Sequence, residues 1–337
     1  MKAYQLTAPG LDGLPQIERP EPTPGPADVI VAVEAVSLNF RDLAVIKGQF
    51  GPLPPTPLTP LSDMAGRVIA KGAAVSRFAI GDKVAGAFLQ DWLDGPITAA
   101  AQASSLFLPR DGVLAERVRV PEHALVSVPD HLSSVEASTL PIAGVTAWNA
   151  LQAGNLQPGD WALVQGTGGV SIFALQLAKA LGARVIVTSS SDGKLERALE
   201  LGADAVINYR QDAEWPETAR RIAGVAGVNL VVEVGGTETF APSIQALALN
   251  GVVSSVGFLT GFKVTLDLYA ALIGKSATLK GMRVGSRADF EALNEMLSEH
   301  KIKPVIDTVF GFDQAREALK HLEAGKHFGK VVISLNS

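Results

Sequence analysis

The sequence predicts an α/β protein in which a doubly wound parallel sheet is inserted into a β-rich, partly barrel-like domain. Three observations support this prediction. Short β-type runs separated by glycine and proline fill the first 130 residues. From residue 161 to residue 256, near-continuous apolar runs alternate with helix-length segments, as in a parallel sheet covered on both faces. A glycine-rich turn at 166–169 follows the first of those apolar runs.

The N-terminal region is expected to be largely antiparallel. Its β-type runs are 29–36, 65–71, 83–88, 116–120 and 124–128, and the proline-dense stretch 52–57 separates the first two. Residues 89–110 are expected to form a long loop, and such loops are usually functional or mobile. Two helices over 290–300 and 314–324 and a final strand over 330–335 are expected to return to this domain.

The glycine-rich turn predicts a dinucleotide site. A strand over 161–165 leads into the turn, and a helix over 170–181, closed by Gly182, and a second strand over 184–188 follow it. Glycines let backbone N–H groups approach a pyrophosphate, and the helix N-terminus supplies partial positive charge. A bare glycine turn would be a weak signal. The two flanking strands and the capped helix indicate the first βαβ unit of a Rossmann-type fold.

The rest of the parallel sheet follows in the order that this fold requires. Helices are expected over 193–201, 212–223 and 238–249, and they alternate with strands over 205–208, 229–234 and 251–256. Each crossover has the length of a helix, as parallel pairing requires.

The end of the second strand indicates which dinucleotide is bound. NAD-specific folds place an acidic residue there to hold the ribose 2′-hydroxyl, and that carboxylate would repel a 2′-phosphate. Here Ser189, Ser190 and Ser191 occupy this place, and Lys194 stands nearby as a point charge for phosphate. Asp192 is expected to cap the next helix. These residues favour NADP(H), and the alternative is that the three serines are only a polar loop.

Composition excludes several classes of protein. The chain has 337 residues, 47% hydrophobic and 19% charged, which is an ordinary globular composition with length for two domains. Its net charge of -5 gives no basic footprint for nucleic acid. Without an apolar leader or a membrane-spanning run, it is expected to be cytoplasmic and without a membrane partner. The absence of cysteine removes disulfides, thiolate nucleophiles and cysteine-type zinc sites.

Ordered motifs along the whole chain carry a family resemblance. Besides the glycine turn, they are VSLNFRD at 36–42, PLSDMAG at 60–66, FAIGDKV at 78–84, LPIAGVTAW at 140–148 and FGKVVI at 328–333. The chain thereby resembles the medium-chain dehydrogenase/reductases, specifically the zinc-free branch that is similar to quinone oxidoreductases. The resemblance implies a GroES-like catalytic domain over 1–127 and 267–337, an NADP(H)-binding Rossmann domain over 128–266, and an active site between them. It also implies a homodimer formed through the nucleotide domain's edge near 277–282.

The resemblance further implies that no metal takes part in the reaction. Zinc-dependent members of the family carry their catalytic metal on Cys, His and Cys, and those places fall here on Asn39, Ser62 and Ile142. None of these residues can replace a thiolate or an imidazole, and Ile142 has no donor atom. The cysteine-rich lobe that binds a structural zinc is absent as well. A metal-independent protein without a metal site is expected.

The resemblance also extends the cofactor site. Ser189, Lys194 and Tyr209 fit the places that surround a 2′-phosphate in NADP-using quinone oxidoreductases, and Lys326 or Lys330 is a further candidate cation. Ser171 stands where many relatives have glycine or alanine, and its larger side chain is expected to loosen helix-to-strand packing. The full set of expected cofactor residues is Thr146, Gly166, Gly168, Gly169, Val170, Ser189, Ser190, Lys194, Tyr209, Val234, Gly257, Phe258, Phe328 and Lys330.

Catalytic residues are harder to assign, because a hydride donor supplies most of the chemistry. Asn39 is the first candidate, since its amide could donate to a developing oxyanion. Asp42 and Ser62, on the same two motifs, are the other candidates. Asp63 takes the place of an acid that lies behind the zinc ligands in the zinc enzymes, so a structural role is expected.

Two aromatic residues and the histidines complete the survey of candidate site residues. Phe50 and Trp92 are expected to wall an apolar substrate pocket, although aromatic residues in a β-rich domain are usually core. The five histidines show no metal or triad spacing.

The predicted function is NADPH-dependent hydride transfer to quinones or α,β-unsaturated carbonyls, without a metal. One alternative is a zinc-independent alcohol or aldehyde dehydrogenase/reductase. The other belongs to a different class, a non-catalytic NADPH-binding protein. The intact cofactor motif does not separate these three. A small-molecule substrate is expected in the two enzymatic cases.

Overall fold

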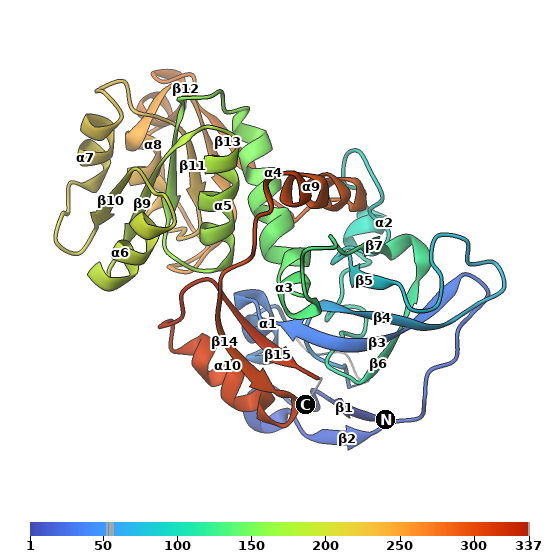
Figure 1. Cartoon of the computed structure of the whole chain (residues 1–337). Helices are drawn as coiled ribbons and strands as arrows, with labels where there is room; N and C mark the ends of the chain where they lie inside the picture. The colour runs from blue at the N-terminus through green and yellow to red at the C-terminus, as the bar shows by residue number, and fades with distance from the viewer. Residues whose placement is uncertain (52, 54–56, 336–337) are drawn as a thin grey trace. The chain divides into compact units, whose positions relative to one another are not determined.

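The computed structural model describes residues 1–51, 53 and 57–335. The chain forms two compact units, Met1–Val145 with Val284–Ser337 and Thr146–Arg283 (Figure 1). Each unit has its own sheet and its own buried core. Of the expected proline-dense stretch, Pro52, Pro54, Pro55 and Thr56 lie outside the described residues. No helix in the described part of the chain is long and apolar enough to cross a lipid bilayer.

The first unit is built around a seven-stranded mixed sheet. Its hydrogen-bonded order is β14, β15, β3, β4, β5 and β7, and β6 pairs with β3. The strands are β3 (Asp28–Ser37), β4 (Asp63–Lys71), β5 (Lys83–Gly86), β6 (Arg117–Pro121), β7 (Leu125–Ser127), β14 (Ile306–Gly311) and β15 (Lys330–Ser334). Only β14 and β15 pair in parallel in this sheet as described. A separate antiparallel pair joins β1 (Lys2–Tyr4) to β2 (Gln16–Glu18).

The β-rich region that was expected to be partly barrel-like is thus an open mixed sheet, because the described strand order does not return to its start. Helices and helical turns of this unit are η1 (Leu11–Gly13), α1 (Phe40–Ile46), α2 (Ala99–Gln102), η2 (Glu122–Ala124), α3 (Ser134–Ala137), η3 (Leu140–Gly144, a π-helix), α9 (Arg287–His300), η5 (Phe312–Gln314) and α10 (Ala315–Glu323). The expected long loop at 89–110 contains the short helix α2. Helix α9 begins before the expected residue 290, because Ser286 caps it by accepting from the Asp289 N–H.

The second unit contains a six-stranded parallel sheet in the order β10, β9, β8, β11, β12 and β13. The strands are β8 (Trp161–Gln165), β9 (Arg184–Ser189), β10 (Ala205–Asn208), β11 (Val228–Glu233), β12 (Leu247–Ser255) and β13 (Thr278–Gly281). The order changes direction at β8, so the connections on its two sides cover opposite faces of the sheet. The predicted doubly wound sheet is confirmed.

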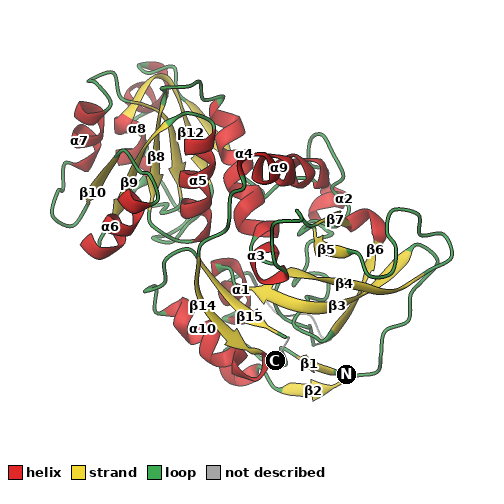
Figure 2. Ribbon diagram, in the orientation of Figure 1, coloured by secondary structure: helices red, strands yellow, loops and turns green. Residues whose placement is uncertain are grey.

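Helices cover this parallel sheet. They are α4 (Val145–Gly154), α5 (Gly169–Ala180), α6 (Asp192–Glu200), α7 (Trp215–Ile222), α8 (Phe240–Ala246) and η4 (Tyr269–Ile273, a π-helix). Helices α5 and α6 pack against β8, β9 and β10, and α8 packs against β11 and β12 (Figure 2). The helix expected over 238–249 ends at Ala246 instead. Leu247 already pairs with Val228 in the sheet, so β12 begins earlier than residue 251.

The division between the units falls later in the chain than the domain boundaries expected at 127/128 and 266/267. Residues 128–145 lie in the first unit, where α3 packs on β3 and β4. Residues 267–283 lie in the second unit, because β13 pairs in parallel with β12. The first boundary is therefore set by packing partners far away in the sequence, and the second by pairing with the preceding strand.

Candidate functional site

The glycine turn of the second unit has the geometry that a bound pyrophosphate needs. Strand β8 is buried along its whole length, and the chain turns at Gly166 with φ of +71°, a conformation that favours glycine. Gly168 is the N-cap of α5, and a Cβ atom built there would meet nothing within 4 Å. Gly169 and Val170 then open the helix. The turn thus leaves room beside the helix N-terminus for a phosphate group.

Ser171 ties the first turn of α5 to β8. Its side chain is buried, and its Oγ atom donates to the Gln165 carbonyl at 2.7 Å. The expectation that this larger side chain loosens helix-to-strand packing is wrong. The hydroxyl fits because it finds a backbone acceptor in the buried contact between the helix and the strand.

A buried carboxylate that the sequence analysis missed organises the neighbouring loop. Glu233 ends β11 and accepts hydrogen bonds from the Gly235 N–H at 2.7 Å and the Gly236 N–H at 2.9 Å. It also accepts from Gln165 Nε2 at 2.7 Å, and Gln165 Oε1 in turn accepts from the Val234 N–H at 3.2 Å. These bonds join the end of β8 to the Val234 loop. A charged residue that ends an apolar strand two positions before Gly-Gly was the available signal.

The residues expected to choose between NADP(H) and NAD(H) gather at the carboxyl ends of β9 and β10. Ser189 ends β9, and the Tyr209 N–H donates to its carbonyl at 3.2 Å. The Tyr209 side chain is 45% exposed, and Lys194 lies in the first turns of α6. Ser189 Oγ accepts from the Ser191 N–H at 3.3 Å.

Asp192 does not cap α6. The N-cap is Ser191, and Asp192 is the first helical residue. Its carboxylate accepts from Asn208 Nδ2 at 2.6 Å and Gln211 Nε2 at 2.9 Å. The expectation of a capping role is wrong, because the side chain finds amide donors beyond β10. A carboxylate therefore lies at this edge of the sheet together with Lys194.

The remaining expected cofactor residues divide between the two units. Gly257 follows β12, and a Cβ atom there would lie 2.4 Å from the Val234 carbonyl oxygen, so glycine is required. Phe258 stacks on Phe262 at a centroid distance of 4.6 Å. Thr146 is buried in α4. Phe328 is buried in the first unit, and its N–H donates to Asp307 Oδ1 at 2.9 Å.

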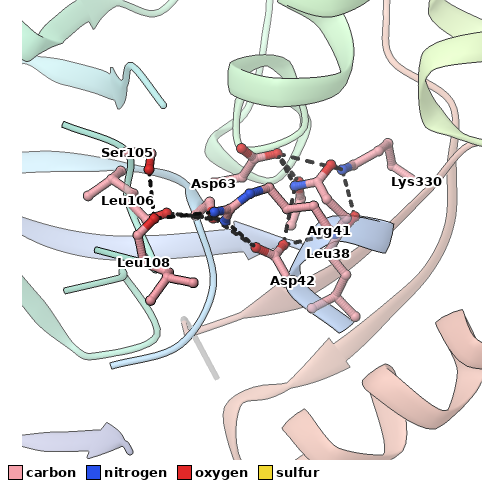
Figure 3. Close-up of polar contacts among 11 residues, drawn as sticks. Leu38, Arg41, Asp42, Asp63, Ser105, Leu106, Leu108 and Lys330 are labelled. Atoms are coloured by element: carbon pink, nitrogen blue, oxygen red, sulfur yellow. Dashed lines mark hydrogen bonds and ion pairs between the residues drawn. The ribbon is translucent and has the colours of Figure 1, made fainter. Parts of the chain in front are cut away.

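In the first unit, the three expected catalytic residues form one hydrogen-bonded cluster. Figure 3 labels Asp42 of this cluster, together with its neighbours Arg41, Asp63 and Lys330. Asp42 Oδ2 accepts from the Asn39 N–H at 3.0 Å, which completes a capping box at the start of α1. Asp42 Oδ1 accepts from Ser62 Oγ at 2.8 Å. Residues close together at the start of α1 therefore form the centre of the cluster, and Ser62, just before β4, extends it.

The Asn39 side chain is fully engaged by its neighbours. Its Nδ2 atom donates to Asp63 Oδ2 at 2.8 Å and, at 3.4 Å, to Asp42 Oδ2. Its Oδ1 atom accepts from Lys330 Nζ at 2.7 Å, and the residue is 9% exposed. In this arrangement both amide hydrogens face carboxylates, so Asn39 is not poised as the expected oxyanion donor.

Lys330 lies inside this cluster. It is 3% exposed, and its Nζ atom donates to the Leu38 carbonyl at 2.7 Å as well as to Asn39. Its ammonium is 3.6 Å from Asp63 Oδ2. The expected contact between Lys330 and a 2′-phosphate is therefore not supported, because the ammonium is buried and already bonded to groups of the first unit. Lys326, the other candidate cation, is exposed.

Burial dominates the electrostatics of the cluster. It raises the pKa of Asp63 to about 6, because desolvation of the carboxylate outweighs the Lys330 ammonium and the Asn39 amide, which both lower that pKa. Burial also raises the pKa of Asp42 and lowers the pKa of Lys330. Ser37 Oγ donates to Asp63 Oδ2 at 3.0 Å, while Asp63 Oδ1 is buried and has no hydrogen-bond partner among the described residues.

Arg41 links the cluster to the segment that was expected to be a long loop. Its Nη1 atom donates to Ser62 Oγ at 2.9 Å and to the Leu106 carbonyl at 3.2 Å. The guanidinium also lies over the Phe88 ring, 4.7 Å from its centroid, and 3.7 Å from Asp42 Oδ1. Arg41 thus forms an ion pair with Asp42 beside Ser62.

The two expected pocket walls lie at different depths. Phe50 is 45% exposed. Trp92 is partly buried against the core of the first unit, and its Nε1 atom donates to the Gly95 carbonyl at 2.9 Å. Their role in a substrate pocket stays a prediction.

The three places where a zinc ion would be held do not fit that ion. Asn39 Oδ1 already binds an ammonium, and the Ser62 hydroxyl already donates to Asp42. Ile142 is a buried hydrocarbon in η3. Zinc in proteins is held by thiolate, imidazole and carboxylate ligands. Within the described residues, no group of three or more His, Cys, Asp or Glu side chains could hold a metal ion.

Two parts of the chain match known protein families. Residues 25–130 match the alcohol dehydrogenase GroES-like domain, and residues 169–299 match the zinc-binding dehydrogenase family. The second match begins in the glycine turn and does not include Asn39, Ser62 or Ile142. The name of that family therefore says nothing about those three positions.

Curated relatives cover most of the chain. A zinc-type alcohol dehydrogenase-like protein of Schizosaccharomyces pombe is 42% identical over 318 residues, which is 92% of this chain and 92% of its own. Quinone oxidoreductase-like protein 2 of Rattus norvegicus is 27% identical over 332 residues, which is 95% of this chain and 88% of its own.

Solved structures with the same fold include proteins associated with either nicotinamide cofactor. A putative alcohol dehydrogenase from Sinorhizobium meliloti 1021 has a TM-score of 0.93 at 42% identity, covering 99% of this chain and 98% of its own. An NAD-dependent alcohol dehydrogenase has a TM-score of 0.88 at 34% identity, with 100% of both chains covered. A mycobacterial protein complexed with NADPH has a TM-score of 0.83 at 27% identity, with 99% of both chains covered.

Proposed function

The chain belongs to the zinc-type alcohol dehydrogenase-like family of medium-chain dehydrogenases/reductases, and from that premise we propose that it transfers hydride from NADPH to quinones or α,β-unsaturated carbonyls without a metal. Its membership makes it an oxidoreductase of the alcohol dehydrogenase-like or quinone oxidoreductase-like type. The choice of cofactor, the acceptor and the absence of a metal are the proposed parts.

A nicotinamide dinucleotide supplies the hydride when bound, and the second unit has the residues to hold it. Gly166 allows the turn, Gly168 leaves the space, and the first N–H groups of α5 would donate to a phosphate bound there. Glu233 fixes the adjacent Val234 loop through backbone N–H groups. We therefore expect this turn to orient the cofactor through backbone atoms and to discriminate little between NADPH and NADH by charge.

A preference for NADPH is supported by the end of β9. A hydroxyl, Ser189, stands there in place of a carboxylate, and Lys194 offers a positive charge within the same edge of the sheet. Asp192 opposes this preference, because its carboxylate is held at the same edge by two amides. One relative in structure carries NADPH and another is NAD-dependent, and we propose that these few residues set the preference in this chain.

One contact supports the proposed substrate class. Lys330 Nζ lies 2.7 Å from Asn39 Oδ1, so an ammonium is bonded to the oxygen atom that a metal ion would need as a ligand. Oxidation of an alcohol loses several kcal/mol of Lewis-acid assistance in such a site. Quinones and enones accept hydride with less help. We propose that Asn39, Asp42 and Ser62 maintain the shape and charge of the site.

A zinc-independent alcohol or aldehyde dehydrogenase/reductase is the second candidate. Two relatives that are 42% identical favour this candidate, because each is described as an alcohol dehydrogenase or as alcohol dehydrogenase-like. A non-catalytic NADPH-binding protein would share the glycine turn and show no turnover.

One screen separates the three candidates. Oxidation of NADPH and of NADH is followed with quinones, enones and aldehydes, and reduction of NADP with primary and secondary alcohols. Turnover of quinones or enones is the expected result. Rapid alcohol oxidation without turnover of quinones or enones selects the second candidate, and tight NADPH binding with no turnover selects the binding protein.

We further propose that two copies pair through the edge of the parallel sheet near Ala277–Met282. Strand β13 pairs with β12 on one side, and among the described residues no strand pairs with its other side. Thr278 and Lys280 on this strand are exposed. An unpaired edge of this kind is a template for a second copy.

A further inference from the structure

The Lys330 ammonium is buried beside Asn39, one of the three positions that correspond to zinc ligands in zinc-dependent relatives. Lys330 begins β15 and is 3% exposed. Its Nζ atom is 2.7 Å from the Leu38 carbonyl oxygen, 2.7 Å from Asn39 Oδ1 and 3.6 Å from Asp63 Oδ2. An ammonium has three N–H donors and no acceptor. Two hydrogen bonds and one ion pair therefore hold the ammonium in place.

The charges of the cluster balance only when this ammonium is counted. Asp42 and Asp63 are both fully buried. Arg41 Nη1 is 3.7 Å from Asp42 Oδ1, and Lys330 is the cation beside Asp63. Removing the lysine alone would leave a buried carboxylate without its cation, which is far more damaging than removing both charges together.

The same ammonium fixes the chain segment that begins α1. Leu38 and Asn39 lie just before that helix, and Asn39 is its N-cap. The ammonium binds the backbone of Leu38 and the side chain of Asn39, so it determines which way the Asn39 amide faces. With its oxygen toward Lys330, that amide presents its hydrogens to Asp63 and Asp42.

We propose that Lys330 is the fixed internal cation of this site and takes the place of a bound metal ion. It is a positioning residue: it neutralises Asp63, orients Asn39 and thereby sets the geometry and the electrostatic potential at which hydride is received. This inference rests on the proposed metal-free oxidoreductase function. Lys330 acts here through Asn39 and Asp63, so it can influence turnover without contacting the cofactor.

The test uses one single variant, one double variant and one matched control in the full-length protein. Lys330→Met removes the charge and keeps most of the side chain. Lys330→Met with Asp63→Asn removes both charges, so no buried carboxylate is left unpaired. Lys303→Met is the control: its ammonium is also 3.6 Å from a carboxylate, that of Glu136, but its side chain is 64% exposed.

Thermal unfolding, the dissociation constant of NADPH, and kcat and KM for the acceptor are measured for each protein. Lys330→Met is expected to unfold at a lower temperature, and the double variant to regain most of that loss. The double variant should nevertheless keep kcat at least about tenfold below wild type, since the preorganised cation is gone. The NADPH dissociation constant of the double variant should stay within about twofold of wild type. Lys303→Met should keep the wild-type unfolding temperature, and its kcat, KM and NADPH dissociation constant should stay within about twofold.

Three outcomes overturn the inference. They are a Lys330→Met protein that matches wild type in unfolding and in kcat, a double variant that regains full kcat, which would make the lysine only structural, and stoichiometric zinc in wild type. A wild-type protein that transfers hydride to no acceptor contradicts the proposed function instead. In that case the unfolding comparison alone decides the inference: recovery in the double variant supports an internal cation, and equal loss in both variants overturns it.

Discussion

The Nζ atom of Lys330 lies 2.7 Å from Oδ1 of Asn39, although 291 positions separate the two residues in the sequence. The bond exists because β15 pairs antiparallel with β3, so that Val332 lies opposite Ser37. The two ends of the chain thus build one polar cluster in the first unit.

Hydride transfer is expected to be independent of metal. Dialysis against a chelator should leave the rate unchanged, because Asn39, Ser62 and Ile142 offer neither thiolate nor imidazole and Asn39 Oδ1 is already bound. Elemental analysis of the dialysed protein should find far less than one zinc per chain. A zinc-dependent alcohol dehydrogenase treated alongside is the control. One tightly held zinc per chain would contradict the prediction.

Lys194→Ala should weaken binding of NADPH and barely change binding of NADH. A charge-assisted contact to the 2′-phosphate is worth about 1.5–3 kcal/mol, which is about tenfold to a hundredfold in affinity. Fluorescence titration with each cofactor gives the two dissociation constants. Lys179→Ala is the control, because Lys179 pairs with Asp204 at 2.7 Å in the same unit. Equal loss for both cofactors would assign Lys194 to helix stability.

Gly168→Ala should weaken the binding of both cofactors and leave the fold intact. Its φ is not in the left-handed region, and a Cβ atom meets nothing within 4 Å, so only a bound phosphate would be displaced. We expect dissociation constants at least about tenfold higher, or about 1.4 kcal/mol. Gly166→Ala, at φ of +71°, should in contrast also lower the unfolding temperature. Unchanged cofactor binding in Gly168→Ala would place the pyrophosphate elsewhere.

The raised pKa of Asp63 should be visible in the pH dependence of stability. That pKa is about 6 in the folded protein against an ordinary 3.8. Between these two pH values the folded protein therefore keeps a proton on Asp63 that the unfolded chain has released. The resulting stabilisation is fully present below about pH 4 and is lost as the pH rises through 6. Between these limits the free energy of unfolding of wild type, relative to Asp63→Asn, should fall by about 3 kcal/mol.

Urea unfolding at a series of pH values measures this difference. Asp12→Asn, the same chemical change at an exposed position, is the control. Parallel pH profiles for wild type and Asp63→Asn would mean that Asp63 stays ionised throughout this range.

A charge on the free edge of β13 should dissociate the proposed dimer. Thr278→Asp places like charges at the edge where two copies are proposed to meet, and like charges that face each other across paired strands repel. Sedimentation velocity should show dimers for wild type and monomers for the variant. Ile80→Asp, which charges an exposed apolar position of the first unit, should stay dimeric. A monomeric wild type would contradict the proposal.

The features of the second unit that the sequence predicted correctly are those that depend on residues close together in the chain. The turn at Gly166–Gly169 and the alternation of apolar strands with helices depend on residues close together in sequence, and both were confirmed. The family resemblance implied that Ser189 and Tyr209 lie together, and the Tyr209 N–H does donate to the Ser189 carbonyl at the shared edge of neighbouring parallel strands. By contrast, the hydrogen-bond partners of Ser171, which donates to a backbone carbonyl, and of Asp192, which accepts from side-chain amides, are set by packing, and both expectations were wrong.

The fold class, the family resemblance and the absence of thiolates follow from the order of motifs and from composition, which do not depend on how distant residues meet. Three features became visible only in the folded chain: Lys330 donates to Asn39, Glu233 accepts from the Gly235 and Gly236 N–H groups, and β13 extends the sheet past residue 266. A buried charge is stable only beside its partner, and the partner of Lys330 is brought there by strand pairing across nearly the whole chain.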